Sequence, residues 1–214
     1  MNELLIESFT LGEWMTNCYV VHVRHQTACW IIDAGYDPLL MIDYIKNNNL
    51  EPKQVILTHG HLDHIAGLSG LRAVWPKLPI LIHPAEQQFP GDPALNLSIM
   101  IQQPIVGPDP TGTIEHDQTL TLGGIDFLVK HTPGHSPGGI TLYQPIEAVA
   151  IVGDTLFAGS IGRYDFPTSD GATLMKSIYE QLMTLPDDTR VLAGHGPDTT
   201  IGKERDHNPF LQSS

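Results

Sequence analysis

The sequence is short of cysteine, of basic side chains and of long apolar runs, and each shortage excludes a class of protein. Its 214 residues include only two cysteines, Cys18 and Cys29, which cannot build a disulfide framework. Eleven Lys and Arg stand against 24 Asp and Glu, a net charge of −13 that argues against nucleic acid or an anionic membrane surface as the partner. No stretch approaches the about 18 apolar residues of a membrane span. What remains is an ordinary globular protein.

Length and composition together predict one domain spanning residues 1–214. The start, Met1-Asn2-Glu3-Leu4, has neither the basic region nor the apolar segment of a signal peptide. Both cysteines lie in apolar, strand-like runs, which predicts buried free thiols. We therefore expect a cytoplasmic protein.

The sequence is organised around the run Thr58-His59-Gly60-His61-Leu62-Asp63-His64, which places three imidazoles and one carboxylate within seven residues. These groups are common ligands of zinc, iron and manganese. Alternate residues of an extended chain point the same way, so His59 and His61 are placed to chelate one ion. Asp63 and His64 lie at the start of a helix and would face a second ion. The alternative is a polar turn with solvated histidines.

The pattern of apolar residues predicts alternating strands and helices, and thus an α/β layered fold. Hairpin turns are expected at 24–27 and at Gly123-Gly124. Helices are expected at 39–48 and at 63–74, where apolar residues recur on one face. Strands are expected at 4–9, 18–23, 28–33, 54–58, 79–82, 119–122, 125–132, 140–143, 148–152 and 189–193.

Residues 90–118 interrupt this alternation with five prolines around an apolar piece, 95–101. A loop of this length in a compact domain is usually functional or mobile. Two interpretations stay open. Either the apolar piece joins the core, or the segment is a flap whose Leu97, Ile99 and Met100 contact a substrate.

Three later strands each lead into a turn with one further ligand-type side chain. The run Thr132-Pro133-Gly134-His135-Ser136-Pro137-Gly138-Gly139 presents His135, Gly153-Asp154-Thr155-Leu156-Phe157 presents Asp154, and Gly194-His195-Gly196-Pro197 presents His195. Proline and glycine allow tight turns that aim a single side chain. A carboxylate has two oxygens, so Asp154 is able to bridge two metals.

These motifs resemble, in order and over nearly the whole chain, those of the metallo-β-lactamase superfamily, beginning with HxHxDH at residues 59–64. The resemblance implies an αββα four-layer sandwich that binds two divalent ions, zinc first, with iron or manganese as alternatives. It further implies the positions of the ligands: the first metal would be held by His59, His61 and His135, the second by Asp63, His64 and His195, with Asp154 bridging.

Asp33, which closes the strand at 28–33, resembles the first motif of the superfamily. Its implied role is to accept a hydrogen bond behind the metal loop and so orient a ligand. The alternative is an aspartate that caps the helix starting near Pro38.

Two segments are similar to the short bacterial glyoxalase II-like branch. They are Gly162-Arg163-Tyr164-Asp165-Phe166-Pro167, close to GRxDxP, and residues 200–210, close to TIGxExxxNPF. Full-length glyoxalase II continues into a helical C-terminal domain that helps to hold glutathione, and we expect that domain to be missing here.

The implied activity is hydrolysis of a thioester such as S-D-lactoylglutathione by a metal-bridging hydroxide. Asp63 and Asp154 are the expected catalytic residues, with Asp63 orienting the hydroxide. Arg163 and Tyr164 are the expected substrate-binding residues, since guanidinium pairs bidentately with carboxylates. The alternative for Arg163 is an ion pair with Asp165.

Three other functions remain open. Persulfide dioxygenases share the fold and a GRTDF segment, and they bind one iron through positions equivalent to His59, His135 and Asp154. The presence of His195 favours the two-metal hydrolase. A lactonase or other ester hydrolase, and a noncatalytic metal-binding protein, are the remaining alternatives.

Overall fold

The computed structural model describes residues 3–212, which form two compact units. The first unit comprises the described residues up to Ile114 together with Thr121–Asp126, and the second comprises Glu115–Leu120 and the described residues from Phe127 onward. Met1 and Asn2, part of the stretch on which the signal-peptide expectation rests, lie outside the described residues, as do Ser213 and Ser214.

The first unit holds a six-stranded sheet with strand order β1-β2-β3-β4-β5-β6. The first three strands are antiparallel and the last four are parallel to one another. The strands are β1 (Leu4–Leu11), β2 (Thr16–Val23), β3 (Ala28–Ile32), β4 (Glu51–Ile56), β5 (Ile80–Ile82) and β6 (Gly112–Thr113). The helices are α1 (Leu39–Asn47), α2 (Leu62–Ile65) and α3 (Leu68–Val74), and the 3-10 turns are η1 (Pro84–Glu86), η2 (Phe89–Gly91) and η3 (Ser98–Met100).

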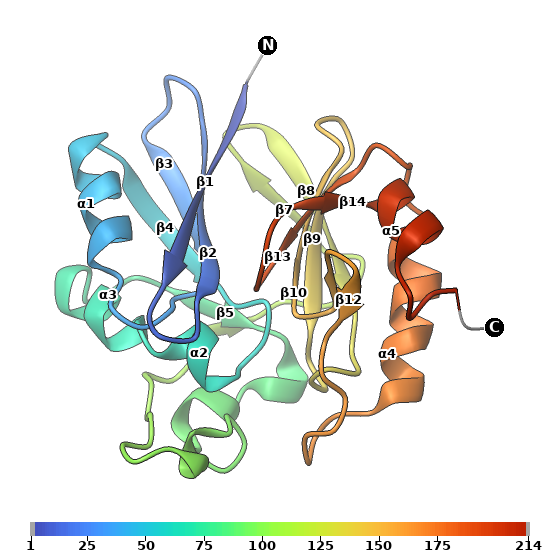
Figure 1. The fold of residues 1–214 in the computed structure, drawn as a ribbon. Helices are drawn as coiled ribbons and strands as arrows, with labels where there is room; N and C mark the ends of the chain where they lie inside the picture. Colours follow the sequence, from blue (N-terminus) through green and yellow to red (C-terminus); the bar gives the residue numbers. More distant parts are fainter. Residues whose placement is uncertain (1–2, 213–214) are drawn as a thin grey trace. The chain divides into compact units, whose positions relative to one another are not determined.

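Helices α1 and α3 lie along one face of this sheet (Figure 1). Their apolar sides meet the buried strands in one core, to which α1 contributes Met41 and Ile45 and α3 contributes Leu68 and Leu71. Strand β2 is buried along its whole length. This burial explains why the middle of the strand, residues 18–21, is a continuous apolar run rather than an alternating one.

The second sheet has strand order β14-β13-β10-β9-β8-β7. Its strands are β7 (Thr119–Leu122), β8 (Ile125–His131), β9 (Ile140–Gln144), β10 (Val149–Gly153), β13 (Arg190–Ala193) and β14 (Thr199–Thr200). A small hairpin joins β11 (Leu156–Phe157) to β12 (Ser160–Ile161), and the helices are α4 (Gly171–Ser177), its π-helical continuation η4 (Ile178–Leu182) and α5 (Ile201–His207).

Helices α4 and α5 cover one face of this sheet (Figure 1). Leu174, Ile178 and Leu182 recur at four-residue spacing and pack with Val152 and Val191 in the core of the second unit. Asp170 caps α4 by accepting a hydrogen bond from the Thr173 N–H.

The predicted strands and the helix at 39–48 are confirmed, with ends displaced by a few residues. The largest difference between predicted and observed ends is at the strand predicted for 54–58. This strand is β4, which starts at Glu51 and ends at Ile56. The single helix predicted for 63–74 is wrong, because the chain forms α2 and α3 instead. The Gly67 N–H donates to the carbonyl of Ala34 on a neighbouring segment, at 2.7 Å, so its hydrogen bond leaves the helical ladder.

The two cysteines are buried free thiols, as predicted. Burial raises the pKa of Cys18 and of Cys29 to about 12, so both are protonated at neutral pH. Among the described residues, no helix has the length and apolar character needed to cross a membrane.

Candidate metal centre

In the first unit, a single turn after β4 carries four of the predicted ligands. His59, His61 and His64 are buried, and the Asp63 side chain is 15% exposed. The ring centroids of His59 and His61 lie 4.7 Å apart, and those of His59 and His64 lie 4.1 Å apart. The turn gathers these imidazoles because α2 starts immediately after His61 and returns His64 towards His59.

Asp33 lies behind this turn and accepts three hydrogen bonds. The donors are the Thr58 N–H at 2.7 Å, the Thr58 hydroxyl at 2.7 Å and His64 Nδ1 at 2.8 Å. A carboxylate only accepts, so Nδ1 of His64 holds the proton and Nε2 offers a lone pair to a metal. The helix cap considered as the alternative is absent, since α1 follows Pro38 with no side-chain cap.

Two residues that support the turn were missed by sequence reasoning. The Thr16 hydroxyl donates to Asp63 Oδ2 at 2.9 Å, and the Gly60 N–H donates to the buried carboxylate of Glu86 at 2.5 Å. Neither residue lies in a motif. Their only sequence signal is position, Thr16 at the start of a buried strand and Glu86 just after the predicted strand at 79–82.

In the second unit, the remaining three ligands come from three separate turns. Asp154 follows β10 and His195 follows β13, and these two strands are parallel neighbours whose ends are tied by the Gly194 N–H to the Gly153 carbonyl at 2.8 Å. Asp154 Oδ2 lies 3.5 Å from Nε2 of His195 and 3.5 Å from Nε2 of His135. One carboxylate therefore stands beside two imidazoles.

The imidazole of His135 is oriented by the backbone rather than by a side chain. Its Nδ1 donates to the Arg163 carbonyl at 2.8 Å, which leaves the Nε2 lone pair facing Asp154. Gly162 permits this approach, because a Cβ there would overlap the Asp154 carbonyl oxygen. The glycine before Arg163 is thus required for close packing.

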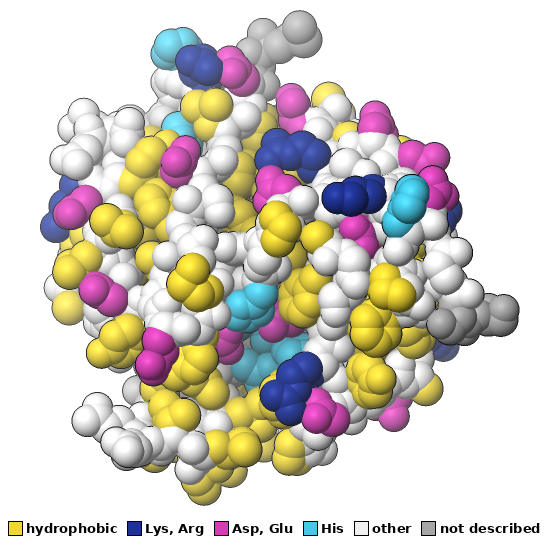
Figure 2. Space-filling view, in the orientation of Figure 1, with side chains coloured by type: hydrophobic (Ala, Val, Ile, Leu, Met, Phe, Trp, Pro, Cys, Tyr) yellow, Lys and Arg dark blue, Asp and Glu magenta, His cyan; other side chains and the backbone are white. Residues whose placement is uncertain are grey.

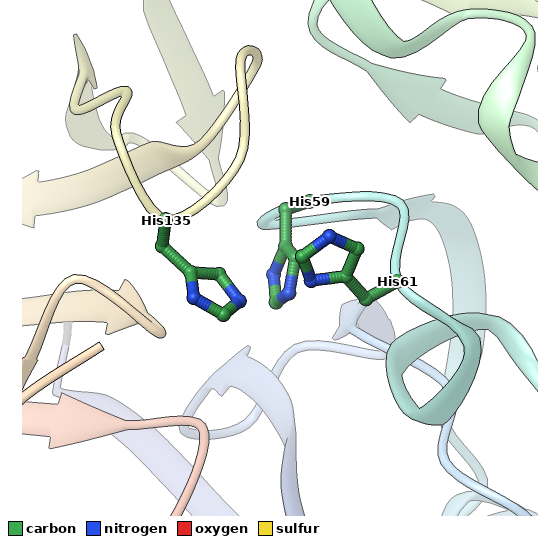
Figure 3. A group of neighbouring side chains, drawn as sticks. All are labelled: His59, His61 and His135. Carbon is green, nitrogen blue, oxygen red and sulfur yellow. The ribbon is translucent and has the colours of Figure 1, made fainter. Parts of the chain in front are cut away.

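The seven predicted ligands are thus divided between the two units. The first unit carries His59, His61, Asp63 and His64, and the second carries His135, Asp154 and His195. Figure 3 labels three of these imidazoles, those of His59, His61 and His135.

The side-chain contacts found for Arg163 and Tyr164, the two expected substrate-binding residues, are with residues outside the predicted ligand set. Arg163 is exposed and pairs with Asp165 through two hydrogen bonds of 2.9 Å, and its guanidinium lies 4.2 Å from the centroid of the Phe166 ring. The bond to Arg163 lowers the pKa of the Asp165 carboxyl. Tyr164 is half exposed and lies against Gly171.

The core interpretation of the 90–118 segment is confirmed for part of it, and the flap interpretation stays a prediction. Asn96, Leu97 and Ser98 are buried, and the Asn96 amide donates to the carbonyls of Phe89 and Ile105. Leu97 is therefore a packing residue, and its expected contact with a substrate is wrong. Met100 is 77% exposed and stays available for a partner.

The charged side chains on the face shown in Figure 2 are scattered, and several Lys and Arg lie next to acidic side chains. Exposed ion pairs join Arg24 to Glu3 and Arg190 to Asp198. Over the described residues of that face, the positive side chains form no continuous band.

Comparison with known proteins identifies the family. The family model for the metallo-beta-lactamase superfamily matches residues 11–195. A probable metallo-hydrolase of Bacillus subtilis, YqgX, is 41% identical over 202 residues, covering 94% of each chain. The hydroxyacylglutathione hydrolase GloC of Haemophilus influenzae is 36% identical over 97% of this chain and 98% of its own length.

Two solved structures agree over nearly their full lengths. The B3 metallo-beta-lactamase BLEG-1 superposes with a TM-score of 0.92 at 39% identity, covering 98% of this chain and 100% of its own. TTHA1623, solved in a di-iron-bound form, superposes with a TM-score of 0.85 at 35% identity, covering 96% of this chain and 100% of its own.

The predicted fold class and the resemblance read from the motifs are both confirmed. The chain belongs to the metallo-beta-lactamase superfamily, as a metal-dependent hydrolase with the two-sheet α/β fold of that family.

Proposed function

We propose that this protein is a two-metal hydrolase of thioesters, of the hydroxyacylglutathione class. The observation that carries the proposal is the full set of seven ligand-type side chains at strand ends, four in the first unit and three in the second, with Asp63 and Asp154 among them. The choice of thioester is supported by GloC, which is similar over 98% of its own length.

The residues present fit two divalent ions. Five imidazoles and two carboxylates make up the donor set, which suits zinc, iron and manganese. Hydrogen bonds to Asp33 and to the Arg163 carbonyl fix the proton on Nδ1 of His64 and of His135. This arrangement is the usual preparation of histidines for metal binding. We propose that His59, His61 and His135 hold one ion, that Asp63, His64 and His195 hold the other, and that Asp154 bridges them.

When bound, such a pair of ions lowers the pKa of a bound water and stabilises negative charge on an attacked carbonyl. The chain's own residues then supply orientation. Asp63 accepts a hydrogen bond at Oδ2 from Thr16, and we propose that it also accepts one from the attacking water and so directs it. A thiolate is a good leaving group, so no side-chain nucleophile is required. Cys18 and Cys29 are buried and protonated at neutral pH, which excludes them from that role.

The substrate is expected to be a small molecule that contacts exposed side chains near the proposed metal centre. Arg163 is proposed to meet a substrate carboxylate by exchanging its partner Asp165, and Tyr164 to lie next to that contact. The exposed side chains of Ile99 and Met100 are proposed as apolar contacts.

Steady-state kinetics on the metal-loaded enzyme test the proposal. A panel of S-D-lactoylglutathione, small thioesters, lactones and β-lactams should show the highest kcat/KM for thioesters. Oxygen consumption with glutathione persulfide should stay at background. If the enzyme with both ions bound cleaves no thioester, the proposal is wrong. Preference for a lactone or a β-lactam would keep the metal chemistry and replace the substrate.

A further inference from the structure

We propose that Glu86 is a positioning residue that fixes the His59-Gly60-His61 turn for metal binding. The proposal rests on the metal centre proposed above, and it adds a residue that lies outside every motif in the sequence. Glu86 closes the 3-10 turn η1 and belongs to the same unit as the turn it supports.

The contact is short and completely buried. Glu86 is 0% exposed, and its Oε2 accepts the Gly60 N–H at 2.5 Å. Gly60 separates His59 and His61, the two histidines proposed to hold one ion, so its peptide plane sets the relative directions of both side chains. A hydrogen bond to an ionised acceptor is roughly twice as strong as one between neutral groups. Glu86 therefore restrains the backbone at the point where the ligand geometry is decided.

Packing restrains the same peptide. A Cβ built on Gly60 would lie 2.5 Å from Cβ of Phe89, so the turn is pressed against the η1–η2 segment. The Phe89 ring lies against the His61 imidazole, with centroids 6.4 Å apart and an interplanar angle of 30°. Asn96 in turn holds the Phe89 carbonyl at 3.1 Å.

Two buried carboxylates thus accept hydrogen bonds from alternate peptides of the turn. Asp33 accepts the Thr58 N–H at 2.7 Å, and Glu86 accepts the Gly60 N–H two residues later. Burying two negative groups costs free energy unless positive charge or hydrogen bonds compensate. A divalent ion bound at His59 and His61 would supply that charge, so metal binding and the two buried carboxylates would stabilise one another.

Metal affinity is the readout that separates positioning from general stability. Zinc dissociation constants should be measured by chelator competition for the wild type, Glu86→Ala and Glu86→Gln. Losing a group behind the ligands typically weakens metal binding about 10–100-fold, and we expect this range for Glu86→Ala. Glu86→Gln should be intermediate, because an amide oxygen still accepts the Gly60 N–H without the charge. The cobalt-substituted forms should show a changed visible absorption spectrum in both variants.

Glu204→Gln is the matched control. Glu204 is also buried and also accepts a glycine N–H, from Gly159 at 2.7 Å, but its partners are Gly159, Thr199 and Asn208 rather than the His59 turn. Glu204→Gln should lower the melting temperature of the metal-free protein about as much as Glu86→Gln does. It should change zinc affinity less than about threefold and leave the cobalt spectrum unaltered, because Glu204 does not contact the His59 turn.

Two results would overturn the inference. One is an unchanged zinc affinity and cobalt spectrum in both Glu86 variants. The other is an equal loss of affinity in Glu204→Gln, which would show that general destabilisation explains the effect. If the wild type binds no metal, the proposed function itself is wrong. The wild-type titration distinguishes this outcome from a failure of the Glu86 inference.

Discussion

The two units present their ligand side chains in opposite ways. The first unit takes four from one turn, residues 59–64, and supports them with the buried carboxylates of Asp33 and Glu86. The second takes three from three turns and orients His135 with a backbone carbonyl. The first arrangement depends on side chains that mutation can remove, whereas the second depends on strand ends and on backbone that mutation cannot easily remove.

This contrast predicts where the candidate centre is sensitive. Behind the ligands, substitutions in the first unit should weaken metal binding, while those in the second should leave it nearly unchanged. At the ligands themselves, the second unit should be the more sensitive, because Asp154 stands beside both His135 and His195.

The largest effect is expected for Asp154→Ala. Its carboxylate lies 3.5 Å from two imidazoles, so its loss affects both proposed ions. Hydrolysis should fall by more than about 100-fold, since even groups behind a ligand cost about 10–100-fold. Metal content should also fall while the far-ultraviolet circular dichroism spectrum stays that of the wild type. Full activity in this variant would contradict the proposed bridging role of Asp154.

Asp33→Ala should have the next largest effect. It removes the acceptor of His64 Nδ1 and leaves the buried Thr58 N–H without its carboxylate. We expect metal affinity to fall about 10–100-fold and the free energy of unfolding of the metal-free protein to fall by about 1–3 kcal/mol. Chelator competition and urea titration measure the two. An unchanged affinity together with lost stability would make Asp33 a purely structural residue.

Arg163→Ala should leave metal affinity within about twofold, because His135 bonds to the backbone of Arg163 and not to its side chain. If the guanidinium meets a substrate carboxylate, KM should rise about three- to tenfold. Asp165→Ala provides the opposite test, since it frees the guanidinium and should lower KM. An unchanged KM in both variants would leave Arg163 as the partner of Asp165 alone.

The smallest effect concerns the cysteines. Burial raises the pKa of both thiols to about 12, so they stay protonated at neutral and mildly alkaline pH. Iodoacetamide at pH 8 should label neither cysteine in the folded protein and both in urea, and prior treatment should leave activity unchanged. Rapid labelling of Cys18 in the folded state, followed by mass spectrometry, would contradict its burial.

The same contrast explains what the sequence could predict. The ligands of the first unit are adjacent in the chain, so their types and spacing indicated a metal site directly. His135, Asp154 and His195 are each unremarkable alone, and only their order along a family pattern connected them. The meeting of Asp154 with His195 depends on the parallel pairing of β10 with β13, which no local pattern specifies.

The sequence does not predict which residues outside the motifs form hydrogen bonds with residues inside them. Glu86 follows Pro84 and Ala85 with nothing to distinguish it from an exposed turn residue, and its burial depends on how η1 returns to Gly60. The break between α2 and α3 has a similar cause, since the Gly67 N–H bonds to Ala34 across the fold. The helix formed by α4 and η4 does have a local signal, the apolar residues Leu174, Ile178 and Leu182 at four-residue spacing.

The central claim is that this chain holds two divalent ions, and elemental analysis of the purified wild-type protein tests it most directly. The account predicts about two ions of zinc, iron or manganese per chain, as two-metal hydrolases require. His195→Ala should lose about one of them, since His195 is proposed to hold the same ion as Asp63 and His64. A single iron per wild-type chain, unaffected by His195→Ala, would contradict the two-metal centre and favour a persulfide dioxygenase.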